Sequence, residues 1–289
     1  MSVRNNQERM GVTNAGTEAP PVQAAVEKAA QVPYAFPTPT EFIDLPSEGK
    51  FYPEDHPLHE VDSVEVRFMT AKDEDILSSP SLLRKGLALD RFLQNILIDK
   101  RIKVDDLLVG DKNALIVGAR MTGYGSDYNT KVVCPSCTTT QEYSFNLEES
   151  LSEINYSLLV ENGIEFTDQQ TLKFTLPKTG YEVEVKLLNG HDERKLMSSA
   201  QRRKKLKMSE ATLTDQLKTI IVSVNGNTDS SLINRFVDSM PAIDSRHLRG
   251  EYAKSIPNID LSQYFSCNEC QHEQDMEVPF TVDFFWPGR

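Results

Sequence analysis

The stretch KVVCPSCTTTQEYSF (131–145) contains half of a metal site. Two residues separate Cys134 from Cys137, and residues typical of strands flank the pair on both sides. A structural zinc site takes four ligands in a tetrahedron, so two thiols cannot complete one. No other cysteine or histidine lies close by in the sequence, so the missing ligands must lie far along the chain.

The stretch QYFSCNECQHEQDMEVPF (263–280) supplies the second half, with Cys267 and Cys270. When Cys134 is aligned with Cys267, similar residues occupy the same alternate positions: Val132 with Phe265, Gln141 with Gln274, Tyr143 with Met276, and Phe145 with Val278. Each segment is therefore predicted to be a strand, a C-x-x-C turn and a returning strand, which is a zinc knuckle. Two facing knuckles make a four-cysteine zinc ribbon, and the chain has four cysteines. We predict that Cys134, Cys137, Cys267 and Cys270 bind one structural Zn²⁺.

Other interpretations of the two cysteine pairs are weaker. A thioredoxin-type redox pair opens a helix after a strand, whereas polar, strand-forming residues follow both pairs here. A disulfide framework is typical of secreted proteins, and the sequence shows no export signal. His272 is an alternative ligand but is more typical of a surface residue. One feature departs from the usual knuckle, which has Gly after the second cysteine, where this chain has Thr138 and Gln271.

Composition limits the class of protein. The 289 residues, of which 39% are hydrophobic, can form one large domain or two ordinary ones with a substantial core. No apolar run approaches the ~18 residues of a membrane span, and the cytosol is the expected compartment. The net charge of −12 opposes binding to a phosphate backbone, so we expect protein partners and no nucleic acid. The oligomeric state stays open.

The chain divides into five expected parts. A tail poor in large apolar residues is expected to be disordered; it is followed by a Pro-rich segment that is either an extended arm or a loop packed on its own domain. A helical layer with the first knuckle comes next, then a β-hairpin with further helices, and last the second knuckle with an aromatic tail. Their ranges are 1–35, 36–62, 63–150, 151–260 and 261–289.

Hydrophobic periodicity predicts a mixed α+β fold, a helical domain with short β-hairpins and the composite zinc ribbon. Residues 63–68 alternate as a strand, and 171–190 form two strands around a turn. Helices are expected after the N-cap Thr70 and over 79–99, 110–123, 191–207, 209–224, 229–240 and 241–256. The basic run QRRKKLK (201–207) is read as a solvated helix face, because it is short and lacks aromatic residues.

No catalytic constellation is visible in the sequence. The five histidines stand in no metal-binding spacing, and the sequence contains no phosphate-binding loop and no nucleophile elbow. We expect no catalytic residues, although a hydrolase with two carboxylates in a cleft stays open.

An aromatic cluster lies near the C-terminus, at Phe280, Phe284, Phe285 and Trp286. Val282, Phe284 and Trp286 alternate as one face of an expected strand, with Phe285 on the other. Burial of both faces takes two surfaces, so Trp286 or Phe285 is expected to contact another subunit.

Several longer stretches together resemble the T4-type bacteriophage baseplate hub assembly family. They are LPSEGKFYP (45–53), MTAKDEDIL (69–77), LLRKGLALDRFLQNILIDKRI (82–102), DLLVGDKNALIVGARMTGYGSDY (106–128), CPSC (134–137), CNEC (267–270) and FFWP (284–287). The resemblance covers about residues 36 to 289 and leaves the N-terminal tail outside. It implies a hub subunit or assembly protein of a contractile tail. Its partners would be other baseplate and hub proteins, and its location the host cytoplasm during assembly or the tail of the virion.

A second functional hypothesis is a nucleic-acid-binding regulator built on a zinc ribbon. Such a ribbon needs basic and aromatic side chains near the knuckles, whereas the second knuckle carries Glu269, Glu273, Asp275 and Glu277. The structural or assembly role is therefore favoured.

Overall fold

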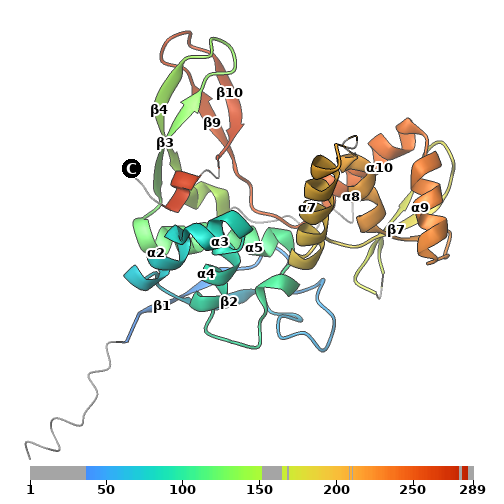
Figure 1. The fold of residues 1–289 in the computed structure, drawn as a ribbon, viewed down its shortest axis with the longest axis horizontal. Coiled ribbons are helices and arrows are strands. Elements are labelled where there is room, and N and C mark those ends of the chain that lie inside the picture. The colour runs from blue at the N-terminus through green and yellow to red at the C-terminus, as the bar shows by residue number, and fades with distance from the viewer. Residues whose placement is uncertain are drawn as a thin grey trace, which may run out of the picture. The chain divides into compact units, whose positions relative to one another are not determined.

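The computed structural model describes residues 37–151, 165–167, 169–207, 209, 211–279 and 282–285. The expected tail (1–35) lies outside these residues, as do Phe280 and Trp286. The described residues from Pro39 onward belong to one compact unit. Helices and short antiparallel hairpins alternate along it, so the predicted mixed α+β class is confirmed (Figure 1).

Residues 40–67 form the first hairpin and part of the core. Strand β1 (Thr40–Asp44) pairs antiparallel with β2 (Ser63–Arg67), which ends one residue earlier than the strand predicted over 63–68. Between them the Pro-rich segment contributes four buried apolar side chains, those of Leu45, Phe51, Tyr52 and Leu58. Gly49 has a φ of +73°, and an added Cβ would lie 2.3 Å from the backbone nitrogen of Val61, so only glycine fits there.

Four helices follow this hairpin: α2 (Ala71–Ser78), α3 (Pro80–Lys85), α4 (Ala88–Ile96) and α5 (Val109–Tyr124). One helix was predicted over 79–99, but Gly86 adopts a left-handed φ of 68° and ends α3, so α4 starts anew at Ala88. Helix α4 packs on the core through one face, on which Phe92, Leu93 and Ile96 are buried. Between α4 and α5 lies a short 3₁₀ helix, η2 (Val104–Asp106).

Two buried carboxylates fix this helical layer. Asp111 in the first turn of α5 accepts hydrogen bonds from the backbone N–H and hydroxyl of Ser47 (2.9 and 2.6 Å) and from the hydroxyl of Tyr52 (2.7 Å). Asp73 in α2 accepts a two-pronged ion pair from Arg67 (2.6 and 2.8 Å). Both carboxylates thus join the β1–β2 region to a helix, where an unpaired buried charge would be strongly destabilising.

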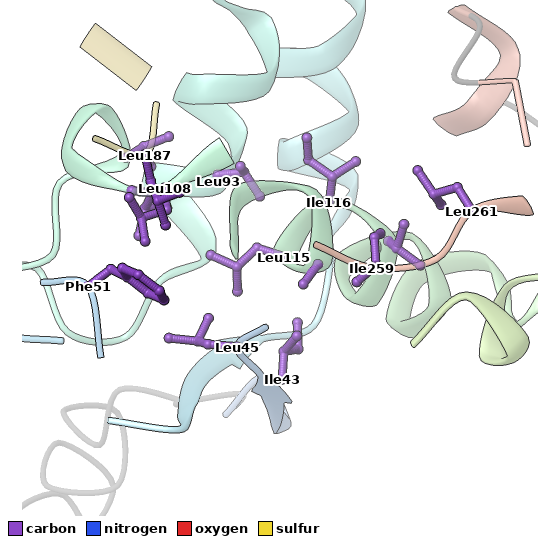
Figure 2. Close-up of a cluster of buried hydrophobic side chains, with 14 of the residues drawn as sticks. Ile43, Leu45, Phe51, Leu93, Leu108, Leu115, Ile116, Leu187, Ile259 and Leu261 are labelled. Atoms are coloured by element: carbon purple, nitrogen blue, oxygen red, sulfur yellow. The ribbon is translucent and has the colours of Figure 1, made fainter. Parts of the chain in front are cut away.

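The apolar core lies where these elements meet. Figure 2 shows side chains from β1, α4, α5 and two later loops pointing toward one another. All of the labelled ones are buried: Ile43, Leu45, Phe51, Leu93, Leu108, Leu115, Ile116, Leu187, Ile259 and Leu261. Because Leu187, Ile259 and Leu261 come from the second half of the chain, one core joins both halves.

The second half contains a four-stranded antiparallel sheet in the order β5-β6-β7-β8. Its strands are β5 (Glu165–Phe166), β6 (Leu172–Thr175), β7 (Glu182–Val185) and β8 (Ile221–Val224). Its helices are α7 (Gly190–Lys205), α8 (Thr212–Ile220), α9 (Ser230–Ser239) and α10 (Ala242–Ser255). The helix predicted over 209–224 was wrong beyond Ile220, because the β-branched run that follows pairs with β7 instead.

Helix α7 is tied to the first half by backbone and ionic contacts. The N–H of Gly190 donates to the carbonyl of Leu107 (3.1 Å), and Val109 donates to Leu188 (3.0 Å). The ammonium group of Lys112 in α5 lies 3.0 Å from the carboxylate of Glu193 in α7. These contacts fix the start of α7 against η2 and α5.

The C-terminal aromatic segment forms a 3₁₀ helix, η4 (Val282–Phe285), and not the expected strand. Phe284 and Phe285 are 2% and 4% exposed, and their rings contact Tyr128 and Phe92 within the same chain. The predicted subunit contact is therefore wrong for Phe285, because the tight 3₁₀ turn lets one core bury both rings. The buried guanidinium of Arg120 holds this turn, since its Nε donates to the carbonyl of Phe284 (2.7 Å).

Within the described residues, no helix is both long enough and apolar enough to cross a membrane.

Candidate metal centre

Two further hairpins carry the cysteines. The first comprises β3 (Asp127–Val133) and β4 (Thr140–Asn146), and the second β9 (Ser262–Ser266) and β10 (Glu273–Glu277). Both match the strand, turn and returning strand predicted from the sequence. They lie side by side in Figure 1, with the short 3₁₀ helix η3 (Leu147–Leu151) directly after β4.

The four predicted cysteines come together between the hairpin turns. Their sulfur atoms all lie within 4.8 Å of one another. The Sγ of Cys134 is 3.7 Å from that of Cys270, and the Sγ of Cys137 is 3.7 Å from that of Cys267. A disulfide would need about 2.05 Å. Four sulfurs at about 2.3 Å from one tetrahedral zinc would stand roughly 3.8 Å apart, so this arrangement is compatible with a metal site.

The two turns have the same internal hydrogen bonds. In the first, the N–H of Cys134 donates to Thr139 O (2.9 Å) and the N–H of Thr138 donates to Cys134 O (2.9 Å). In the second, Cys267 donates to His272 O (2.9 Å) and Gln271 donates to Cys267 O (3.0 Å). The matched pattern points both sulfurs of each turn at one centre.

The residue after the second cysteine of each pair is not the usual glycine, and its backbone shows how the turn forms without one. Thr138 and Gln271 have φ angles of 59° and 57°, in the left-handed region that glycine adopts most easily. Both turns therefore keep the backbone shape of a knuckle at some conformational cost. The shape comes from the turn and its hydrogen bonds, and glycine is not required for it.

Burial divides the cysteines by their place in each turn. Cys134 and Cys267, the first of each pair, are buried, whereas Cys137 is partly exposed and Cys270 is exposed. Each 3.7 Å contact joins a buried sulfur of one hairpin to a more exposed sulfur of the other. The cluster therefore has one side closed by protein and one side near solvent, by which an ion can enter.

The thiols of the cluster ionise unequally. Hydrogen bonds from the side chain and backbone of Thr139 lower the pKa of Cys137 to about 6. The backbone N–H of His272 acts in the same sense on Cys270, but partial desolvation and the three neighbouring thiols outweigh it and raise the pKa of Cys270 to about 11. Close-packed sulfurs resist a second negative charge. A divalent cation would remove that resistance by supplying the opposite charge.

Two glutamine side chains join the hairpins. Gln141 donates from Nε2 to Ser266 O (3.0 Å) and accepts from the N–H of Asn268 (2.9 Å). Gln263 accepts from the N–H of Asn146 (3.1 Å) and donates back to its carbonyl (2.6 Å). In the sequence, Gln141 matched only Gln274, and nothing there indicated that it spans the two hairpins.

Apolar contacts complete the joint. Val132, Phe145, Phe265 and Val278 are buried as the alternating pattern predicted. The ring of Tyr143 lies 5.3 Å from that of Phe265, and its hydroxyl donates to Tyr264 O (2.7 Å). The sulfur cluster thus sits at the end of a small shared core.

The alternative ligand His272 is not part of the cluster. Its Nε2 contacts the side-chain oxygen of Gln274 (3.2 Å). Among the described residues, the four cysteines are the one group whose ligand atoms are close enough together to hold a metal ion.

A family described as T4 bacteriophage base plate protein matches residues 39–286, which include both hairpins and the whole described core. No curated protein and no solved structure matches the chain.

Proposed function

Because the chain belongs to the T4 bacteriophage base plate protein family, we propose that it is a structural or assembly protein of a contractile phage tail. It acts at the central hub of the baseplate through contacts with other baseplate and hub proteins. It is made in the host cytoplasm and acts there during assembly or as a subunit of the tail of the virion. The observation that carries the proposal is the family match over nearly all of the compact unit.

We further propose that Cys134, Cys137, Cys267 and Cys270 hold one Zn²⁺. Two features support this: the 3.7 Å sulfur contacts, close to the edge of a zinc–thiolate tetrahedron, and the matched hydrogen bonds of the turns. Four thiolates fill the coordination of zinc and leave no position for water or substrate. The ion would therefore be structural.

The physical role of the ion would be a clasp. The two hairpins are joined by a small core and a few hydrogen bonds, and an isolated two-stranded hairpin is marginally stable. Zinc would fix the two turns together and hold both hairpins in place at the end farthest from the helical layer (Figure 1). A rigid projection of this kind suits a protein that docks on neighbours.

The charges of the second hairpin favour this role over a nucleic-acid-binding regulator. Glu273, Asp275 and Glu277 are exposed along β10, at alternate residues on one face. This row of carboxylates would repel a phosphate backbone. A role without catalysis also fits a metal with no open coordination position.

The zinc proposal is tested by elemental analysis of the reduced, freshly purified protein. We expect one zinc per chain, lost in a Cys134→Ser, Cys267→Ser double variant. Ser136→Ala, a change in the same turn that removes no sulfur, should keep the metal. Absence of zinc from the wild-type protein would refute this part of the proposal.

The assembly proposal is tested in the phage that encodes the chain. Deletion of the gene should stop the formation of complete tails, as counted by electron microscopy. Mass spectrometry of purified tails then tells a tail subunit from an assembly factor. Normal tails without the gene would refute the proposal, whatever the metal content of the protein.

A further inference from the structure

Strand β1 has an open edge. Its ladder with β2 is bounded by two hydrogen bonds, from Phe68 N–H to Pro39 O (2.9 Å) and from Leu45 N–H to Asp62 O (2.7 Å). Backbone groups in an antiparallel pair alternate between facing the partner strand and facing away. The odd-numbered residues of β1 therefore bond to β2, and the N–H and C=O groups of Thr40, Phe42 and Asp44 point outward. Within the described residues, no other strand pairs with this edge.

The side chains show that β1 is firmly held on its inner side. Ile43 is buried against α5, where an added Cβ on Gly118 would lie 2.5 Å from Ile43 Cδ1. Phe42 points the other way and is 65% exposed, the most exposed large apolar side chain of the described residues. It sits at the middle of the open edge. A fixed strand with free backbone groups and a central exposed aromatic ring is a template for another strand.

Several of the features that protect a sheet edge are missing from β1, and its charged side chains are the carboxylates of Glu41 and Asp44. Its five residues, TEFID, contain no lysine and no proline, and the register with β2 runs from Thr40 to Asp44 without a bulge. Soluble proteins generally block such edges, because an open one recruits other chains. We therefore propose that β1 pairs across this edge with an extended strand of another protein of the tail.

The charges define the chemistry of that strand. Glu41 and Asp44 lie in β1, and Glu65 stands opposite Phe42 on β2. A partner strand with basic residues, and an apolar residue to cover Phe42, complements this surface. A second copy of the chain fits poorly, because it would bring the same carboxylates to the edge and a further net charge of −12. The proposal rests on the assembly function, since it names one of the contacts by which the chain would act.

The first test is amide hydrogen exchange on the free, full-length protein, followed residue by residue by NMR. We expect slow exchange at Glu41, Ile43 and Leu45 and fast exchange at Thr40, Phe42 and Asp44. Protection of the outward amides in the free protein would overturn the proposal, because the edge would then be covered by the chain itself.

The second test removes one outward donor, together with the exposed ring beside it, without touching the ladder. Phe42→Pro deletes an N–H that faces away from β2, a place where edge strands accept proline. We expect unchanged thermal stability and a fall of about tenfold or more in the yield of complete tails. Thr40→Pro acts at the same edge and serves where Phe42→Pro unfolds the protein. Ile43→Pro is the matched control, since it breaks the ladder itself and should lower stability.

Separate outcomes distinguish this proposal from the assembly function. Normal tail yield with a folded Phe42→Pro or Thr40→Pro chain overturns the strand pairing. If gene deletion blocks tails in the same experiment, the assembly function stands without it. Loss of tails with both folded variants, together with exchange-protected outward amides in assembled tails, supports the pairing.

Discussion

The two cysteine hairpins have the same turn but different outer faces. On the first, the cross-strand neighbours Lys131 and Glu142 carry opposite charges. On the second, three carboxylates follow one another along β10, and the strand opposite presents Tyr264, which is 56% exposed. The inner faces are alike, because a shared core and one sulfur cluster constrain them. The outer faces are free of that constraint, so the difference between them reflects what each hairpin contacts in the assembly.

The largest expected effect comes from removing a ligand, and it tests whether the two turns are equivalent. Cys134→Ser and Cys267→Ser should each abolish zinc binding and remove much of the roughly 10–16 kcal/mol that structural zinc supplies in zinc-finger peptides. Zinc content and chemical denaturation measure this. If one substitution were harmless, the two hairpins would not share one metal.

Acidification should release the metal, since protons compete for thiolates. In the metal-free protein, the exposed cysteines of the two hairpins should lose their protons at different pH values. The pKa of Cys137 is lowered to about 6, so its contribution to stability is complete above the ordinary value of 9.0 and is lost as pH falls through 6. The pKa of Cys270 is raised to about 11, so its contribution is present below 9.0 and is lost as pH rises through 11.

These directions are checked by thiolate ultraviolet absorbance of the metal-free protein, with Cys137→Ser and Cys270→Ser as matched variants. The first thiolate to form on raising the pH should vanish in Cys137→Ser and persist in Cys270→Ser. If that thiolate instead persisted in Cys137→Ser and vanished in Cys270→Ser, the cysteine with the lowered pKa would belong to the second hairpin.

Core truncation should cost unequal amounts at equivalent positions. Phe265→Ala should lower the free energy of unfolding by about 3–5 kcal/mol, and Val132→Ala by about 1–2 kcal/mol, because the larger ring leaves the larger cavity. Denaturation of the zinc-loaded protein measures both. Equal losses would show that the ring of Phe265 adds nothing to the joint beyond the volume of a valine.

The smallest expected effect lies at the left-handed residues. Thr138→Gly and Gln271→Gly should each change stability by up to about 1 kcal/mol in the favourable direction, with the larger gain for the β-branched threonine. Thr140→Gly, in a strand, should instead destabilise the protein. A loss at both knuckle positions would show that these side chains make contacts that outweigh the strain.

Much of the cysteine site could be predicted from the sequence, because it depends on local rules. The C-x-x-C spacing and the alternation around it determine a turn and two strands, and the matched flanks indicate that the two halves meet. The contacts of Gln141 and Gln263 could not be predicted in this way. They depend on how the hairpins face each other, and a polar residue in a strand has no pattern that marks it as buried.

The rest of the fold shows the same division. The start of α2 at Thr70 and the hairpin of β6 and β7 follow from capping and turn residues. The change from α8 to β8 at Ile221 does not, because the apolar spacing there suits a helix until pairing with β7 decides otherwise. The C-terminal segment was mistaken for a strand for a similar reason, since its alternation is real but Arg120 and Phe92 set its conformation.

The separation of the two cysteine pairs has a consequence for synthesis. Cys137 and Cys267 are 130 residues apart, and a ribosome adds roughly 5–20 residues per second, so the first pair waits roughly 7–26 s for its partner. Arg120 waits longer still, since the carbonyl that it binds is 164 residues away. A chain that ends before Cys267 would therefore lack both closures, and one that ends between Cys270 and Phe284 would lack the Arg120 contact. Only a chain that reaches Phe284 can therefore form both the cysteine cluster and the contact with Arg120.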